Sequence, residues 1–287
     1  MVAAMKKMLI AGFAIAAMAA LGVSCQKNAL QTPEGRRAVS FEASIASTPG
    51  TKFSMTDEGT YVKASWEVGD EIAVLWYAGT DEVTAETYEK FTVTSVSADG
   101  KRATFSNESS AFPASGEVTA MLVYPYLDYL DGYNYHPAGS FTTAELADPG
   151  QTVIYYAKVN VADGAIPALT FTQQNSFLYI KSGTLFPGVT EGSYWLAVPG
   201  VLFNGVANRE TGDKLTVPNY RNISTSKLAF DGTGAIQQDV WIPFFPDGAA
   251  INNLRVTVGT TPNTIFNVGS NTPEVGKVYD LSNKFSE

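Results

Sequence analysis

The residues of this chain that could carry chemistry are few, and we begin with its single cysteine, Cys25. Lys6 and Lys7 precede an uncharged apolar run, residues 8–23, which ends in small residues at this cysteine. A basic start, a short apolar segment and a small-residue end are typical of a secretory signal peptide. The run is shorter than the roughly 20 residues that a membrane-spanning helix needs. We therefore expect residues 1–24 to be an export signal.

The five residues that end at this cysteine, Leu21-Gly22-Val23-Ser24-Cys25, resemble a bacterial lipobox. In that motif the cysteine thiol is acylated, as with palmitate, and the cysteine becomes the new N-terminus. A lone cysteine cannot form a disulfide within the chain, and this one stands where acylation would need it. We predict a lipid anchor at Cys25. The alternative is an earlier cut, for example after Ala19, which would leave Cys25 as an incidental thiol.

Other chemical candidates are weaker. With one histidine, His136, and a cysteine that we expect to be acylated, Cys-His catalysis and histidine-rich metal sites are excluded. No Gly-x-Ser-x-Gly elbow and no Walker loop occurs. Asp128, Asp131 and Asn134 are the best local set of metal ligands or glycosidase acids, but their spacing fits no EF-hand and suits turns. We predict a protein that is not an enzyme and binds no metal or cofactor.

Aromatic residues offer a binding chemistry instead. Tyr129, Tyr133 and Tyr135 lie in a Gly-containing stretch, residues 128–140, that we expect to be a long surface loop. Their rings could stack on sugars, or they could simply cover a sheet edge with their hydroxyls in water. The four tryptophans all lie in strand-like runs and are predicted to be core residues: Trp66, Trp76, Trp195 and Trp241.

The charge of the chain excludes one class of partner. The formal net charge is -9, and loss of residues 1–24 removes two lysines and no acid, which leaves -11. Such a surface repels phosphate backbones and anionic headgroups, so we expect no nucleic acid and no membrane contact beyond the lipid anchor. The exported part is rich in Thr, Val, Tyr, Phe and Gly, which is a β-protein composition.

The elements that would position these residues are short strands. Residues 25–37 are polar and are expected to form a flexible linker. After them, apolar residues alternate in short runs between turn signals, and no stretch shows a helical period. Ile72, Val74 and Trp76, for example, would share one strand face. A junction near Asp163 then leads to a second series of strands, so we predict an all-β chain of two tandem β-sandwich domains, residues 38–165 and 166–287.

Several pieces of the sequence, in this order, resemble the fimbrillin-like proteins, the type V pilus subunits of anaerobic Gram-negative bacteria. The pieces are Phe41-Glu42-Ala43, Thr51-Lys52-Phe53, Trp66-Glu67-Val68-Gly69-Asp70-Glu71-Ile72, Ala120-Met121-Leu122-Val123-Tyr124-Pro125-Tyr126, Gln151 ahead of Tyr155-Tyr156-Ala157, Leu169-Thr170-Phe171, and Gly276-Lys277-Val278-Tyr279. Each piece is short, and their order along the chain makes the resemblance.

The resemblance implies transthyretin-like sandwiches, carried on a lipoprotein of the outer membrane and assembled at the cell surface with other pilus subunits. In such pilins an arginine-specific protease removes the N-terminal strand, and a strand from a neighbour fills the groove by β-augmentation. Here the cut would fall between Arg37 and Ala38, or between Arg36 and Arg37. Little chain follows Tyr279, so an anchor, tip or accessory role is open. The implied function is that of a fimbrial subunit or adhesin; the alternative is a surface glycan-binding lipoprotein that does not polymerise.

Overall fold

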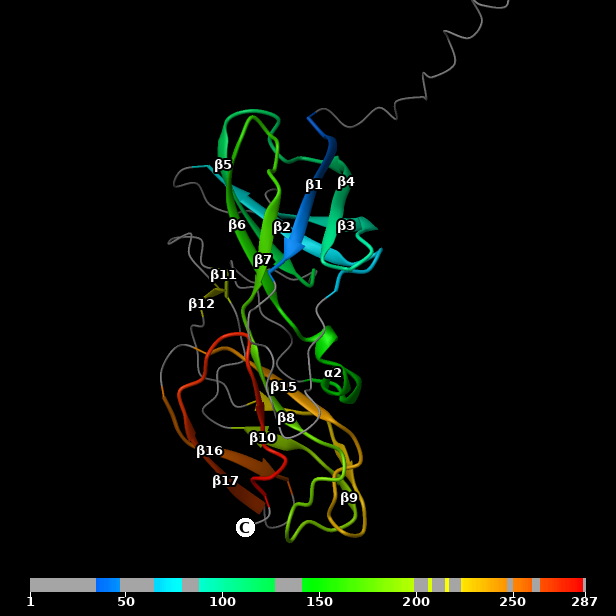
Figure 1. Cartoon of the computed structure of the whole chain (residues 1–287), viewed down its shortest axis with the longest axis vertical. Helices are drawn as coiled ribbons and strands as arrows, with labels where there is room; N and C mark the ends of the chain where they lie inside the picture. Colours follow the sequence, from blue (N-terminus) through cyan, green and yellow to red (C-terminus); the bar gives the residue numbers. More distant parts are fainter. Residues whose placement is uncertain are drawn as a thin grey trace, which may run out of the picture. The chain divides into compact units, whose positions relative to one another are not determined.

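The computed structural model describes residues 35–46, 65–78, 88–126, 141–198, 206–207, 215–216, 223–246, 250–259 and 264–285. These parts are almost entirely β-structure, as the sequence predicts (Figure 1). The elements are β1 (Arg37–Ile45), β2 (Glu71–Tyr77), β3 (Tyr88–Val96), β4 (Arg102–Ser110), β5 (Glu117–Tyr124), α2 (Thr143–Ala147), a 3-10 turn (Pro149–Gln151), β6 (Tyr155–Ala162), β7 (Leu169–Gln173), β8 (Ser176–Ile180), β9 (Gly192–Tyr194), β10 (Leu196–Val198), β11 (Val206–Ala207), β12 (Leu215–Thr216), β13 (Ile223–Ser224), β14 (Leu228–Phe230), β15 (Val240–Phe244), β16 (Ile251–Val258), β17 (Thr264–Asn271) and β18 (Val278–Asp280).

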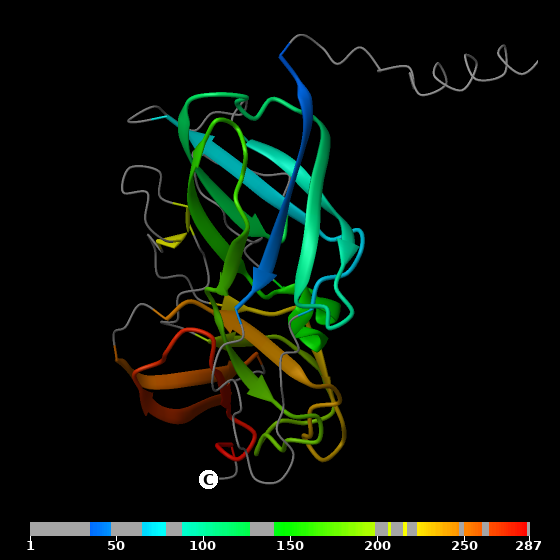
Figure 2. The same cartoon turned by 45° about the horizontal axis from the view of Figure 1, so that its top comes forward.

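The first half is a closed barrel, which corrects the expected sandwich. Its strands follow the order β1-β4-β3-β2-β5-β6-β7 (Figure 2). The ring closes because β1 pairs in parallel with β7, with Ala43 opposite Leu169. That pairing joins residues more than a hundred positions apart, and alternation within each strand carries no information about such a partner.

The side chains of β2 show the predicted alternation. Ile72, Val74 and Trp76 lie in the main barrel core, whereas Ala73 and Leu75 lie in a separate cluster on the opposite face. Both faces of β2 are therefore buried, which explains why its sequence is almost continuously apolar.

A turn before β2 fixes the largest side chain of the barrel core. Gly69 adopts a positive φ of 99°, and the Glu67 N–H donates to the Asp70 carboxylate at 2.8 Å. Trp66, just before this turn, lies with its ring centroid 5.0 Å from Phe105 and 5.3 Å from Phe171. The predicted core position of Trp66 is confirmed.

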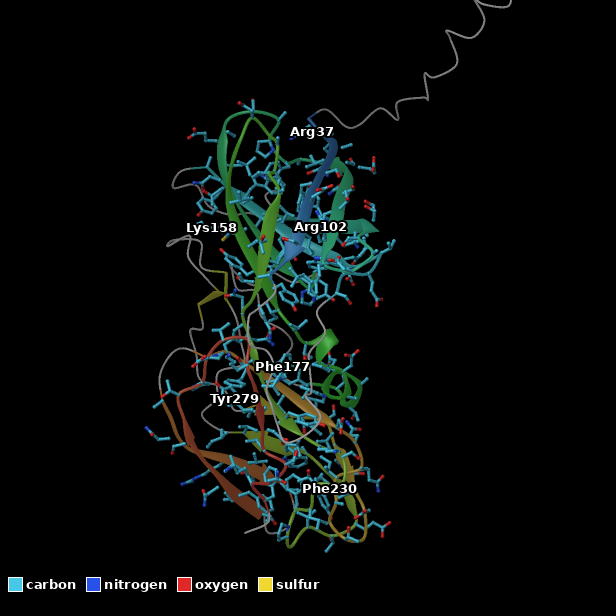
Figure 3. All side chains as sticks on the ribbon, viewed as in Figure 1. Arg37, Arg102, Lys158, Phe177, Phe230 and Tyr279 are labelled. Carbon is cyan, nitrogen blue, oxygen red and sulfur yellow. The ribbon has the colours of Figure 1, made fainter. Side chains whose placement is uncertain are left out.

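The second half is divided among smaller sheets. β13-β10-β16-β17 form a four-stranded sheet, β15-β8-β18 a three-stranded sheet, and β11-β12 and β14-β9 are two-stranded pairs. On β16 the inward Val256 and Val258 are buried and Arg255 is exposed, so this strand is buried on one face. Phe230 of β14 lies in the same core as these valines (Figure 3).

The three-stranded sheet has a different apolar cluster on each face. Phe177 and Tyr179 of β8 belong to the barrel core, whereas Leu178 and Ile180 belong to the core of the second half. Moreover, β7 lies after residue 165 and still belongs to the barrel sheet. The domain division at residues 165 and 166 remains a prediction, but the barrel extends beyond it.

The short helix α2 was not predicted, although its start carries a clear signal. The Thr142 hydroxyl accepts from the Glu145 N–H, and the Glu145 carboxylate accepts from the Thr142 N–H at 2.7 Å, which is a capping box. The helix has five residues, too few for a helical period to show in the sequence. Its single buried residue, Leu146, lies in the core of the second half.

Candidate functional site

The strand β1 is the element on which the expected assembly mechanism depends. Its burial alternates along the strand, and the inward side chains are Val39, Phe41, Ala43 and Ile45. Phe41 stacks on Phe105 with ring centroids 5.4 Å apart and contacts Phe91 at 5.7 Å. This strand thus supplies one complete apolar stripe to the barrel core.

On its two edges β1 is held by β4 and β7 (Figure 1). Only three residue pairs join it to β7. The Ser44 and Thr170 hydroxyls lie 3.0 Å apart across this pairing, and the Ala46 N–H donates to the Phe171 carbonyl at 2.8 Å. Toward β4, the Ser106 hydroxyl donates to the Ser40 hydroxyl at 3.1 Å. The pairing of β1 with β7 is therefore short.

The predicted processing site lies at the beginning of this strand. Arg36 and Ala38 are exposed, and Arg37 is half-buried as the first residue of β1 (Figure 3). A cut between Arg37 and Ala38 would leave eight of the nine residues of β1 in place. No other arginine occurs before Arg102, which lies in β4. Arginine-specific processing at this position would therefore leave β1 in the chain, and the cut itself stays a prediction.

The C-terminal segment is packed, not extended. β18 pairs in parallel with β8, and the Leu281 N–H donates to the Tyr179 carbonyl at 2.8 Å. Phe285 is buried and stacks on Phe186 with centroids 4.3 Å apart. To give a strand to a neighbour, this segment would first have to leave the core.

One long strand lies at the margin of a sheet. β17 is the outermost strand of the four-stranded sheet among the described residues, and it pairs with β16. Its eight residues contain no charge and no proline. Natural edge strands commonly carry such residues to prevent pairing with another chain. The sequence shows that this strand is uncharged. It does not show which strands lie at the edge of a sheet.

Burial changes the acidity of groups near the barrel turn. Burial, together with the carboxylates of Asp70 and Glu67, raises the pKa of Tyr124 to about 12. Burial also raises the pKa of Asp70, against the opposing effect of the hydrogen bond from the Glu67 N–H. Tyr124 and Asp70 lie beside the buried ring of Trp66, so we assign these shifts to packing and not to catalysis.

Several predicted site residues lie outside the described part of the chain. They are Cys25, Tyr129, Tyr133, Tyr135, Asp128, Asp131, Asn134 and His136. Within the described ranges, no three His, Cys, Asp or Glu side chains gather where they could hold a metal ion. No helix in these ranges is long and apolar enough to cross a membrane.

One tryptophan prediction is wrong. Trp66, Trp76 and Trp241 are buried as expected, but Trp195 is 48% exposed. Leu196 and Val198 point into the core of the second half, so the alternation of the strand turns Trp195 outward. The sequence carried this signal, because the residues two apart at 196 and 198 are both aliphatic.

Comparison with known proteins gives similarities at the level of solved structures. No protein-family model and no curated protein matches the chain. A structure of a candidate cell adhesion protein from Bacteroides ovatus matches with a TM-score of 0.47 and 17% identity over 85% of this chain and 91% of that one. A fimbrial assembly protein from Parabacteroides distasonis matches with a TM-score of 0.40 and 12% identity over 85% and 90%. The fimbrial anchor protein Mfa2 from Porphyromonas gingivalis matches with a TM-score of 0.41 and 12% identity over 83% and 82%. At this level of similarity, these matches assign neither a family nor a function.

Proposed function

We propose that this chain is a non-enzymatic subunit of a fimbrial or adhesive assembly at the cell surface. It is exported as a lipoprotein, held at the outer membrane by an acylated Cys25, and joined to other subunits by exchange of β-strands. The lipobox-like sequence and the ordered fimbrillin-like pieces support the location and the class. The strand β1 supports the mechanism.

The observation that carries the proposal is the way β1 fits into the barrel. The strand is the first that the structure describes, contributes one apolar stripe and makes a short ladder with β7. A strand of similar alternation from another subunit could take the same place and restore the barrel hydrogen bonds. Because arginine processing leaves β1 in the chain, exchange here requires the whole strand to move aside.

The position of Arg37 also distinguishes a subunit that stays anchored from one that is released by cleavage. Cys25 precedes Arg37, so a cut after Arg37 would release the folded part from its lipid anchor and still leave β1 in place. An anchored subunit must therefore remain uncut at this bond. N-terminal sequencing and intact-mass analysis of protein from the native surface should find an acylated Cys25. A start at Ala38 would contradict the anchored role.

A disulfide that fixes β1 tests strand exchange. Ser44 and Thr170 are opposite each other in the β1–β7 register, with their hydroxyls 3.0 Å apart. We expect the double variant Ser44→Cys, Thr170→Cys to block assembly when oxidised and to restore it when reduced. The measurement is the ladder of high-mass species in membrane extracts of cells that carry the variant in place of the native chain.

The matched control places the same crosslink on strands that do not exchange. Ser95 and Thr104 lie opposite each other on β3 and β4, with their hydroxyls 2.9 Å apart. The double variant Ser95→Cys, Thr104→Cys should assemble normally in both redox states. If the oxidised Ser44–Thr170 variant also assembles normally, β1 is not the exchanged strand and the proposed mechanism is wrong.

A further inference from the structure

The outward face of the four-stranded sheet carries an exposed indole that is held flat against the backbone. Trp195 pairs with Gly259, whose N–H donates to the Trp195 carbonyl at 3.0 Å. A Cβ built on Gly259 would lie 2.7 Å from the nearest ring atom of Trp195. The indole therefore covers Gly259 at contact distance, while 48% of the residue remains exposed to solvent.

The contact with the indole explains why residue 259 is a glycine. Gly259 does not have a positive φ, so its backbone conformation does not require a glycine. What requires it is the space that the ring occupies, since any larger residue would push the indole off the strand. The ring is thus pre-positioned against the sheet with about half of the residue exposed, which lowers the entropy cost of stacking a ligand on it.

The same face continues from Trp195 with side chains that suit a polar ligand. Thr257 is half-buried, and it lies opposite Ile265, which is 55% exposed. Arg255 lies opposite Asn267, and both are exposed. By strand geometry, Arg255 and Gly259 are about 13 Å apart along β16. An extended surface of this length suits a chain of several rings better than a single ring.

Charge points to the kind of ligand. Arg255 is an exposed cation on a chain of net charge -9, and no described residue forms an ion pair with it. A guanidinium binds a carboxylate through two parallel hydrogen bonds. Asn267 beside it offers both a donor and an acceptor.

We propose that this face, formed by Trp195, Thr257, Arg255 and Asn267, binds a short acidic oligosaccharide. The apolar face of one pyranose ring stacks on Trp195, and a carboxylate of a neighbouring sugar pairs with Arg255. The site goes beyond strand exchange and does not depend on it. It also lies on elements different from the tyrosines at 129, 133 and 135 that the sequence suggested for glycan contact.

Intrinsic fluorescence gives a direct readout, because the other three tryptophans are buried. We expect an oligogalacturonate tetramer or sialyllactose to protect the wild-type protein from acrylamide quenching, and neutral maltotetraose to protect it far less. Calorimetric titration then compares variants of the mature chain, with circular dichroism as the check of folding. Trp195→Ala should weaken binding at least about tenfold, and Arg255→Gln should weaken the acidic probes alone.

Two further variants make the test specific. Gly259→Ala keeps the indole but displaces it from the strand, so it should weaken binding as Trp195→Ala does. Leu185→Ala removes a side chain of similar exposure, 53%, outside this face and should change nothing. The proposal is overturned if neither acidic probe binds, if neutral and acidic probes bind equally, or if binding survives Trp195→Ala. It is also overturned if Trp195→Ala abolishes self-association instead, because the face would then be a protein interface.

Discussion

The barrel and the second half of the molecule both bury large aromatic cores, but their strands are arranged in sheets differently. In the barrel, seven strands form one closed ring, so each has a neighbour on both edges. In the second half, eleven described strands are divided among four sheets, and several of them have only two or three residues. The barrel therefore offers a partner little backbone unless a strand leaves, whereas the second half presents an outermost strand and an open sheet face.

The difference suggests a division of tasks. A closed barrel can pair with a strand of another chain only if one of its own strands is replaced, which suits the proposed exchange of β1. An open sheet can accept contacts without losing any of its own, which suits the proposed sugar site around Trp195. The two parts nevertheless share the three-stranded sheet of β8, whose side chains lie in both cores. Their stabilities should therefore be linked.

The largest expected effect tests this link. Trp66 contacts four aromatic rings in the barrel core, and Phe186 stacks on Phe285 in the other core. We expect Trp66→Ala and Phe186→Ala each to lower the free energy of unfolding by about 3–5 kcal/mol. Because β8 belongs to both cores, calorimetry should show one unfolding transition that both variants shift. Two transitions, each shifted by one variant, would instead show independent domains.

Alkaline pH should weaken the barrel specifically. An unfolded tyrosine has a pKa of about 10, whereas the pKa of Tyr124 in the fold is about 12. The neutral phenol therefore contributes stability that is fully present below pH 10 and is lost as the pH rises toward 12. The loss is about 2 kcal/mol, since partial exposure moderates it. Urea unfolding from pH 8 to 11.5 should show a shallower decline for Tyr124→Phe, and equal declines would contradict this assignment.

Loss of the N-cap of α2 should lower the free energy of unfolding by a smaller amount. Thr142 caps α2, which precedes β6 in the chain but carries Leu146 into the second core. We expect Thr142→Ala to lower the free energy of unfolding by about 1 kcal/mol. Thr143→Ala, one residue later and not at the cap, should stay within about 0.5 kcal/mol. Chemical denaturation measures both, and equal losses would show that the cap contributes nothing of its own.

Local patterns predicted the strands well. The alternation of Ile72, Val74 and Trp76 and the core positions of Trp66 and Trp241 agree with the structure. Each depends on residues within a few positions of one another, so the sequence contains the whole cause. The missed elements are those with little local pattern, such as β11 and β13, which have two residues each.

The candidate sites divide in the same way. The proposed export and lipid attachment depend on a linear signal around Cys25, which can be read from the sequence alone and which lies outside the described residues. The exposure of Trp195 could have been inferred from Leu196 and Val198, but its contact with Gly259 required a strand sixty residues away. Cleavage at Arg37 stays a prediction, and what such a cut would leave in the chain depends on where β1 begins.

What the sequence determined by itself is the β class, the faces of individual strands and the acidic surface, since each follows from residue type and near neighbours. Tertiary structure alone decided that β1 closes a barrel against β7, that β8 serves two cores, and that an indole lies over a distant glycine. Those features depend on which strands pair, and pairing is set by the packing of the whole chain.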